Sequence, residues 1–130
     1  MKRYLLIVVL TILSSIAIGQ NKVKKLSASD FFIKMEQCED KLILDCSELK
    51  TYKKEHLEDA VSIASSKDMI RVLMNIDKET HLFIYCKHGD RSKTASKKIK
   101  ALGFKNIYEL KDGLHDWKEL EYPTIKKLRK

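Results

Sequence analysis

The stretch "HLFIYCKHGDRSKTASKKIKALGF", residues 81–104, carries the clearest signals of secondary structure in the chain. Its first part, "HLFIYC", is an apolar run of the length of a strand that is buried on both faces. Its last part places Ala95, Ile99 and Leu102 at helical spacing and stops at Gly103, a residue type that commonly follows the end of a helix. The sequence therefore predicts a strand, a tight loop and a helix in immediate succession.

The same alternation continues on both sides of this stretch. Strands are expected at residues 41–46, 60–64, 81–86 and 106–110, and helices at 26–37, 47–56, 65–76, 92–104 and 114–120. Short connections between alternating elements imply right-handed crossovers. We therefore predict one α/β domain of three layers (α/β/α), with a central parallel sheet of about five strands covered by helices on both faces.

Ligands of such sheets bind at the carboxyl ends of the strands, where Cys86 and Asp45 are both expected. Gly89 permits the positive φ of a tight loop, and a chain that curls from strand to helix points successive N–H groups toward its centre. The following helix adds its positive dipole end, and Lys87 and Arg91 add charge. An anion is favoured there, so we expect a reactive thiolate at Cys86 that attacks electrophilic sulfur or phosphorus.

The N-terminal segment "MKRYLLIVVLTILSSIAIGQ" has two basic residues, an apolar core and small residues near position 19. This is the pattern of a secretory signal peptide, predicted at residues 1–19 with cleavage before Gln20. The alternative is an uncleaved N-terminal membrane anchor. We expect an exported protein, with a bacterial periplasm as its compartment, and a single domain over residues 20–130.

The chain carries a formal net charge of +8, concentrated in lysine-rich runs. It has no nucleic-acid motif and no interleaving of aromatic with basic residues, so nucleic-acid binding is not expected. Attraction of small anions or acidic surfaces is the milder inference. The run at residues 126–130 is expected to be a frayed tail.

An odd count of three cysteines leaves at least one thiol unpaired within the chain. Cys38 and Cys46 flank an expected strand, so a bridge between them is geometrically awkward. Cys46 is expected to be a core residue, with a role as a resolving thiol kept open.

The segment from "LILD" to "YPTIK" resembles the rhodanese domain, whose active loop reads Cys-x-x-Gly-x-Arg followed by Ser or Thr. This chain has Cys86, Gly89, Arg91 and Ser92 in that register. The stretches "LILDCSELKTYKKEHLEDA" and "LKDGLHDW" are similar to two further motifs of the family. One departure is Asp112, which stands where the family usually has the first of two glycines.

The resemblance implies a sulfurtransferase that carries sulfane sulfur as a persulfide on Cys86, from a donor such as thiosulfate to a thiol or cyanide. Cysteine-dependent phosphatases place five residues between Cys and Arg, whereas four lie between Cys86 and Arg91, so phosphatase or arsenate-reductase activity is less favoured. A non-catalytic or persulfide-carrier module that acts through a protein partner is the main alternative. The expected partners are a small sulfane-sulfur donor, a thiol acceptor and in some settings a protein thiol. No cofactor is expected, and the histidines show no metal-ligand spacing.

The candidate site is the catalytic Cys86, six residues of a persulfide-binding loop and a supporting aspartate. The loop residues are Lys87, His88, Gly89, Asp90, Arg91 and Ser92. Arg91 is expected to shape the loop or bind the anion, and Ser92 to cap the helix or donate toward the sulfur. Asp45 either steadies the loop, as the resemblance implies, or caps the helix that begins at "SELK".

Overall fold

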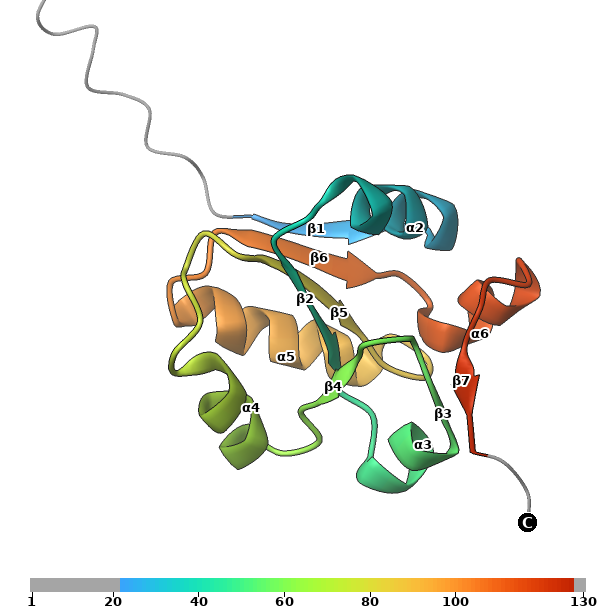
Figure 1. Ribbon diagram of the computed structural model, residues 1–130. Coiled ribbons are helices and arrows are strands. Elements are labelled where there is room, and N and C mark those ends of the chain that lie inside the picture. The colour runs from blue at the N-terminus through green and yellow to red at the C-terminus, as the bar shows by residue number, and fades with distance from the viewer. Residues whose placement is uncertain (1–21, 128–130) are drawn as a thin grey trace, which may run out of the picture.

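Five parallel strands form the central sheet of the computed structural model, which describes residues 22–127 (Figure 1). Their order across the sheet is β1 (Val23–Leu26), β6 (Asn106–Leu110), β5 (His81–Tyr85), β2 (Lys41–Asp45) and β4 (Val61–Ser62). The predicted α/β class with a parallel sheet of about five strands is confirmed. The signal peptide predicted at residues 1–19 lies outside the described residues.

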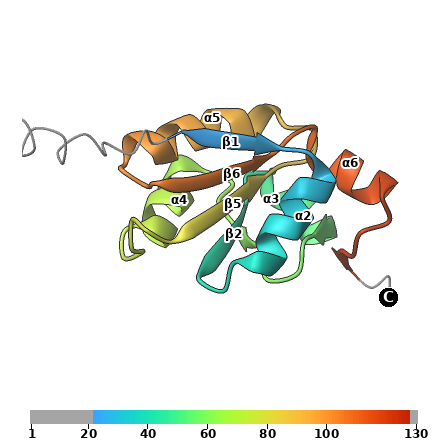
Figure 2. The ribbon, with the colours of Figure 1, turned by 90° about the horizontal axis from the view of Figure 1, so that it is seen from above.

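Helices cover both faces of the sheet (Figure 2). One face carries α2 (Ala28–Gln37) and α6 (Gly113–Glu119), and the other carries α4 (Ser66–Leu73) and α5 (Asp90–Ala101). A further short helix, α3 (Leu49–Lys54), follows β2. None of the helices between residues 22 and 127 has the length and apolar character needed to cross a membrane.

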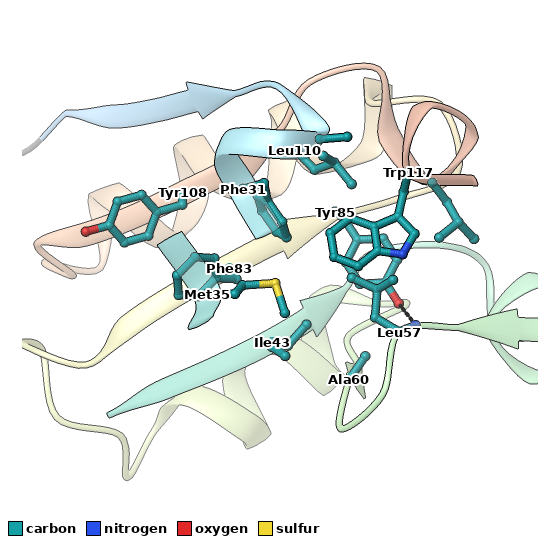
Figure 3. Packing of buried hydrophobic residues seen from close by; sticks show 12 residues of the cluster. Phe31, Met35, Ile43, Leu57, Ala60, Phe83, Tyr85, Tyr108, Leu110 and Trp117 are labelled. Atoms are coloured by element: carbon teal, nitrogen blue, oxygen red, sulfur yellow. Dashed lines mark hydrogen bonds between the residues drawn. The ribbon is translucent and has the colours of Figure 1, made fainter. Parts of the chain in front are cut away.

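Aromatic side chains fill the layer between the sheet and α2 with α6 (Figure 3). Phe31 packs edge-to-face on Phe83 at 5.3 Å and on Trp117 at 6.2 Å between ring centroids. The buried Tyr85 hydroxyl accepts a hydrogen bond of 2.9 Å from the Leu57 N–H. This layer fixes the sheet from one side, so that the ends of β5 and β2 have defined positions.

Aliphatic side chains fill the opposite layer, beneath α4 and α5. Alternate residues of β5 point into it, because side chains of a strand alternate between the two faces. Leu82, Ile84 and Cys86 share this layer with Ile99 of α5 and with Cys46, which follows β2. The candidate nucleophile is therefore the last member of a buried row.

Three strands were missed by the sequence analysis. The strand β1 lies at the edge of the sheet and pairs only with β6. Its Lys24 and Lys25 are exposed, so its sequence lacks the apolar pattern by which the other strands were predicted. Two short strands, β3 (Glu55–His56) and β7 (Ile125–Lys126), pair antiparallel in a separate sheet. The expectation of a frayed tail from residue 126 is therefore wrong at its first residue, because Lys126 pairs with Glu55.

Candidate active site

Cys86 follows the last residue of β5 and is 2% exposed. Its Sγ accepts hydrogen bonds from the backbone N–H of Gly89 at 3.1 Å and of Ser92 at 3.4 Å. Gly89 is the N-cap of α5 and has a φ of +97°, which turns its N–H toward the sulfur. Two N–H donors and the positive end of α5 thus meet at one sulfur atom, an arrangement that favours negative charge on it.

The Ser92 hydroxyl lies on the inner side of the loop. Its Oγ is 3.5 Å from Cys86 Sγ and donates a 3.0 Å hydrogen bond to the Gly89 carbonyl. Ser92 is buried and stands in the first turn of α5, whose N-cap is Gly89. The expectation that Ser92 caps the helix is wrong, because the N-cap is Gly89 and no side chain makes a capping hydrogen bond there.

Arg91 extends away from the sulfur toward the loops that follow the two neighbouring strands. Its Nε donates to the Cys46 carbonyl at 2.6 Å, and its Nη2 donates to the Ala64 carbonyl at 2.8 Å. The residue after β2 and the chain after β4 are therefore tied to the first turn of α5. These contacts are those of a residue that positions the loop.

Asp45 is 1% exposed and lies on the sheet face opposite Cys86. It is in register with Tyr85, whose side chain packs in the aromatic layer. Its Oδ1 accepts a 2.7 Å hydrogen bond from the Ser47 N–H, which fixes the turn into α3. The N-cap of α3 is Glu48, so the expectation that Asp45 caps this helix is wrong.

The turn into α6 supports the loop from outside. The N–H of Leu114 donates to the Cys86 carbonyl at 2.8 Å, and the N–H of His115 donates to the Lys87 carbonyl at 3.3 Å. A Cβ added to Gly113 would lie 2.5 Å from the Cys86 carbonyl oxygen, so the close approach requires glycine here. The "LKDGLHDW" stretch was the sequence signal for this support.

The rim of the loop is open and basic. Lys87 and His88 are exposed and line a groove of about 1590 Å³ that runs beside α3 and α6. The groove is also lined by further basic residues, Lys50, Lys54, His115, Lys118, Lys126 and Lys127, and by four glutamates, Glu48, Glu55, Glu119 and Glu121, so the basic residues outnumber the acidic ones. Asp90 is also exposed but lines a smaller cavity of about 570 Å³ together with Arg91. The loop residues thus divide between two openings.

Known proteins share the sequence pattern and the fold of this domain. A model of the Rhodanese-like domain family matches residues 28–120. The chain belongs to the rhodanese-like domain family. A thiosulfate sulfurtransferase, GlpE of Coxiella burnetii, is 31% identical over 85 residues, which cover 65% of this chain and 78% of the relative.

Two further proteins are similar to this rhodanese-like domain. A candidate sulfur carrier protein, YrkF of Bacillus subtilis, is 28% identical over 97 residues, which cover 75% of this chain and 52% of the relative. The solution structure of the rhodanese-like domain of the Alr3790 protein from Anabaena has a TM-score of 0.71 at 24% identity. That alignment covers 82% of this chain and 81% of the other, and it shows the shared fold.

Cys46 lies beside Cys86 in the rhodanese-like domain but in different surroundings. Its N–H continues the ladder by donating to the Tyr85 carbonyl at 2.8 Å, and it is 3% exposed. Burial raises the pKa of the Cys46 thiol, and the neighbouring Cys86 raises it further. All three cysteines are free, and Cys38 packs on the opposite face of the sheet from Cys46, which confirms that these two do not form a bridge.

Sequence reasoning missed Glu109, a buried acid behind the active loop. It lies on β6, is 3% exposed, and its Oε1 has no hydrogen-bond partner within residues 22–127. The signal that could have found it is the single acidic residue inside the apolar strand "NIYEL". In the same range of the chain, no cluster of three or more His, Cys, Asp or Glu residues is arranged to hold a metal ion.

Proposed function

We propose that this rhodanese-like domain is a sulfurtransferase that carries sulfane sulfur as a persulfide on Cys86. The observation that carries the proposal is the pair of N–H donors from Gly89 and Ser92 on the Sγ of Cys86. Preorganised donors of this kind stabilise charge that develops on the sulfur without having to reorient. The relatives named above support the same chemistry.

The proposed reaction has two steps. The Cys86 thiolate attacks the outer sulfur of thiosulfate, the sulfur–sulfur bond of the donor breaks, and sulfite leaves with the bonding electron pair. An acceptor thiolate or cyanide then attacks the outer sulfur of the persulfide, and Cys86 leaves as the thiolate that began the cycle. The N–H groups of the loop stabilise the anionic sulfur in each resting state.

The side chains of the loop have separate proposed roles. Arg91 positions the loop through the Cys46 and Ala64 carbonyls. Lys87 and His88 stand at the rim of the basic groove, where they attract an anionic donor and select the acceptor. Asp45 supports the site indirectly, because its carboxylate accepts the hydrogen bond from the Ser47 N–H that holds the turn after β2.

Mass measurement after treatment with thiosulfate tests the proposal. We expect the intact protein to gain the mass of one sulfur atom, mapped to Cys86, and to lose it on addition of cyanide or a thiol. The Cys86→Ala variant should gain no sulfur. Failure of wild-type Cys86 to take sulfur from thiosulfate, polysulfide or a small persulfide would refute the sulfurtransferase assignment.

A persulfide carrier that serves a protein partner is the second candidate. The volume of the groove, about 1590 Å³, favours it, because a hollow of this size beside Lys87 and His88 exceeds what thiosulfate needs. A carrier would accept sulfur from a protein persulfide but turn over thiosulfate and cyanide slowly. Comparison of the loading rate with small and protein donors separates the two functions.

Phosphate chemistry is disfavoured by the four residues between Cys86 and Arg91 and by the contacts of Arg91, whose Nε and Nη2 are engaged with carbonyl groups. Hydrolysis of a phosphate ester that is lost in Cys86→Ser would overturn this view.

We also propose that the protein acts after export, with a bacterial periplasm as the compartment and an uncleaved N-terminal anchor as the alternative. Fractionation of the expressing cells and the mass of the mature N-terminus test this location.

A further inference from the structure

The groove beside the active loop is formed by segments that are distant in the sequence. They are the loop itself at Lys87 and His88, the helix α3, the strand β3, the helix α6 with the turn after it, and the strand β7. The hollow measures about 1590 Å³, whereas the pocket for one small molecule is usually about 300–1,000 Å³. A ligand longer than a small sulfur donor therefore fits it.

The small sheet of β3 and β7 joins the walls of this groove beside α3 and α6 (Figure 1). Glu55 of β3 is in register with Lys126 of β7, and the Lys127 N–H donates to the Lys54 carbonyl at 3.1 Å. The Lys118 Nζ of α6 donates to the Glu55 carboxylate at 2.8 Å. Main-chain pairing and an ion pair thus hold β7 against both helices, so the lysines of these walls stand on fixed backbone.

Positive charge is in excess along the groove. Six lysines line it against four glutamates, a net charge of +2 with its two histidines neutral. The half-buried Glu55 is shared by two of the lysines, Lys118 at 2.8 Å and Lys126 at 3.8 Å. The other four lysines are exposed and take part in no ion pair within residues 22–127; they are Lys50, Lys54, Lys87 and Lys127. These four cations are free to meet the charges of a ligand.

An extended acidic peptide matches both the length and the charge of this groove. Lysines on α3, on the active loop and at the end of β7 allow several carboxylates of one chain to meet a cation each. Nucleic acid would meet the same cations, but no aromatic side chain within residues 22–127 lines the groove, so its bases would have no ring to stack on. The charge and the lining together favour a protein ligand.

The position of the groove gives such a ligand access to the active loop. Cys86 is 2% exposed and does not line the groove, whereas the next two residues, Lys87 and His88, do. A chain held along the groove therefore reaches the rim of the loop with one of its ends. A cysteine at that end would lie beside the residues that follow Cys86.

We propose that this groove docks an extended acidic segment of a partner protein and brings the partner's cysteine to Cys86. The inference rests on the proposed function in taking Cys86 as the site of sulfur exchange, and it names the partner by its chemistry, a run of Asp and Glu next to a cysteine. The partner's thiolate attacks the outer sulfur of the Cys86 persulfide, the sulfur–sulfur bond breaks, and Cys86 leaves as a thiolate.

The first test measures docking without sulfur chemistry, in the Cys86→Ala protein. The probe is a fluorescent glutamate-rich peptide that carries serine in place of its cysteine, and the readout is fluorescence anisotropy. The peptide should bind, and its affinity should fall as salt is raised, because salt screens exposed charges. The same peptide with glutamine in place of every glutamate should bind at least about tenfold more weakly.

Two triple variants locate the binding surface. The groove variant, Lys50→Glu with Lys54→Glu and Lys127→Glu, should weaken the acidic peptide at least about tenfold, since attraction becomes repulsion at three positions. The matched control is Lys53→Glu with Lys67→Glu and Lys100→Glu. It makes the same change of net charge at exposed lysines that do not line the groove, and its affinity should stay within about threefold.

The second test measures sulfur transfer from wild-type protein loaded on Cys86 to a cysteine peptide. The glutamate-rich peptide should be the better acceptor by about tenfold in kcat/KM over its glutamine counterpart. Three results would each overturn the proposal: equal binding of the two peptides, equal losses in the two triple variants, or tighter binding of a single-stranded oligonucleotide of the same charge. If Cys86 takes up no sulfur while the acidic peptide still binds, the proposed function fails and the docking surface stands.

Discussion

Cys86 and Cys46 stand at adjacent strand ends, on the same face of the sheet, and are almost equally buried, yet their surroundings differ. Cys86 has two N–H donors on its sulfur and a helix that begins around it. Cys46 lies in the same aliphatic layer, where burial raises the pKa of its thiol. Burial disfavours ionisation of a thiol, whereas peptide N–H groups that point at a sulfur favour it, so we expect Cys86 to be the reactive one of the two.

The largest effect should come from removing each thiol in turn. Cys86→Ala should abolish persulfide formation and cyanide-dependent turnover, a loss of at least about a thousandfold, because the attacking atom is gone. Cys46→Ala should keep turnover within a few-fold of wild type and cost about 1–2 kcal/mol of stability, since it removes a buried packing group. Turnover and thermal unfolding of both variants measure the contrast; loss of persulfide in Cys46→Ala would mean that the two thiols act together.

The second effect concerns the support that only the Cys86 loop possesses. Gly113→Ala places a methyl group 2.5 Å from the Cys86 carbonyl oxygen and 2.6 Å from the Lys87 carbonyl, so the loop must move. We expect loss of about 2–4 kcal/mol of stability and at least tenfold in turnover. Gly103→Ala is the matched control, because it also has a positive φ but no atom within 4 Å of the added Cβ. It should cost about 1 kcal/mol and leave turnover unchanged; equal losses in both variants would show that φ, and not the contact with the loop, matters.

The third effect concerns Arg91, whose side chain ties the first turn of α5 to the Cys46 carbonyl. Arg91→Ala removes the hydrogen bonds to the Cys46 and Ala64 carbonyls and should cost about 1–3 kcal/mol with a several-fold fall in turnover. Arg71→Ala, which breaks only an exposed ion pair with Asp68, should change stability by less than about 0.5 kcal/mol. Chemical denaturation and steady-state turnover measure both. A fall in donor affinity at unchanged stability would instead assign Arg91 to anion binding.

The smallest effect concerns the buried carboxyl of Glu109, which lies on β6 in register with Ile84. Because the pKa of Glu109 is raised in the folded state, the fold prefers the protonated form and pays a penalty as pH rises through that pKa. Glu109→Gln should therefore be more stable than wild type at neutral and alkaline pH, by about 1 kcal/mol or a few degrees in Tm. The difference should vanish at acidic pH, and thermal unfolding across pH measures it. A variant that is less stable than wild type at every pH would show that the carboxylate is compensated by its lysines.

The elements that depend on a local sequence pattern could be predicted from the sequence. The apolar runs at β2, β5 and β6 and the glycine at position 89 were enough to predict the inner strands of the sheet, the loop and the place of Cys86. The edge strand β1 was not predicted, because its pattern is polar. The direction of the Arg91 side chain was not predictable, because it depends on carbonyl groups that follow two other strands. The burial of Glu109 was missed because it depends on which helix covers that face of β6.

The hydrogen bonds from the α6 turn to the carbonyls of Cys86 and Lys87 have a consequence for motion. A peptide unit is rigid, so holding these carbonyl groups outward restricts how the loop can rotate. Opening of the loop must therefore break the hydrogen bonds that the Leu114 and His115 N–H groups donate to it. Both residues lie on a different helix, α6. Hydrogen exchange at these two amides should slow when Cys86 is loaded, so the occupancy of the sulfur can be followed from the opposite side of the loop.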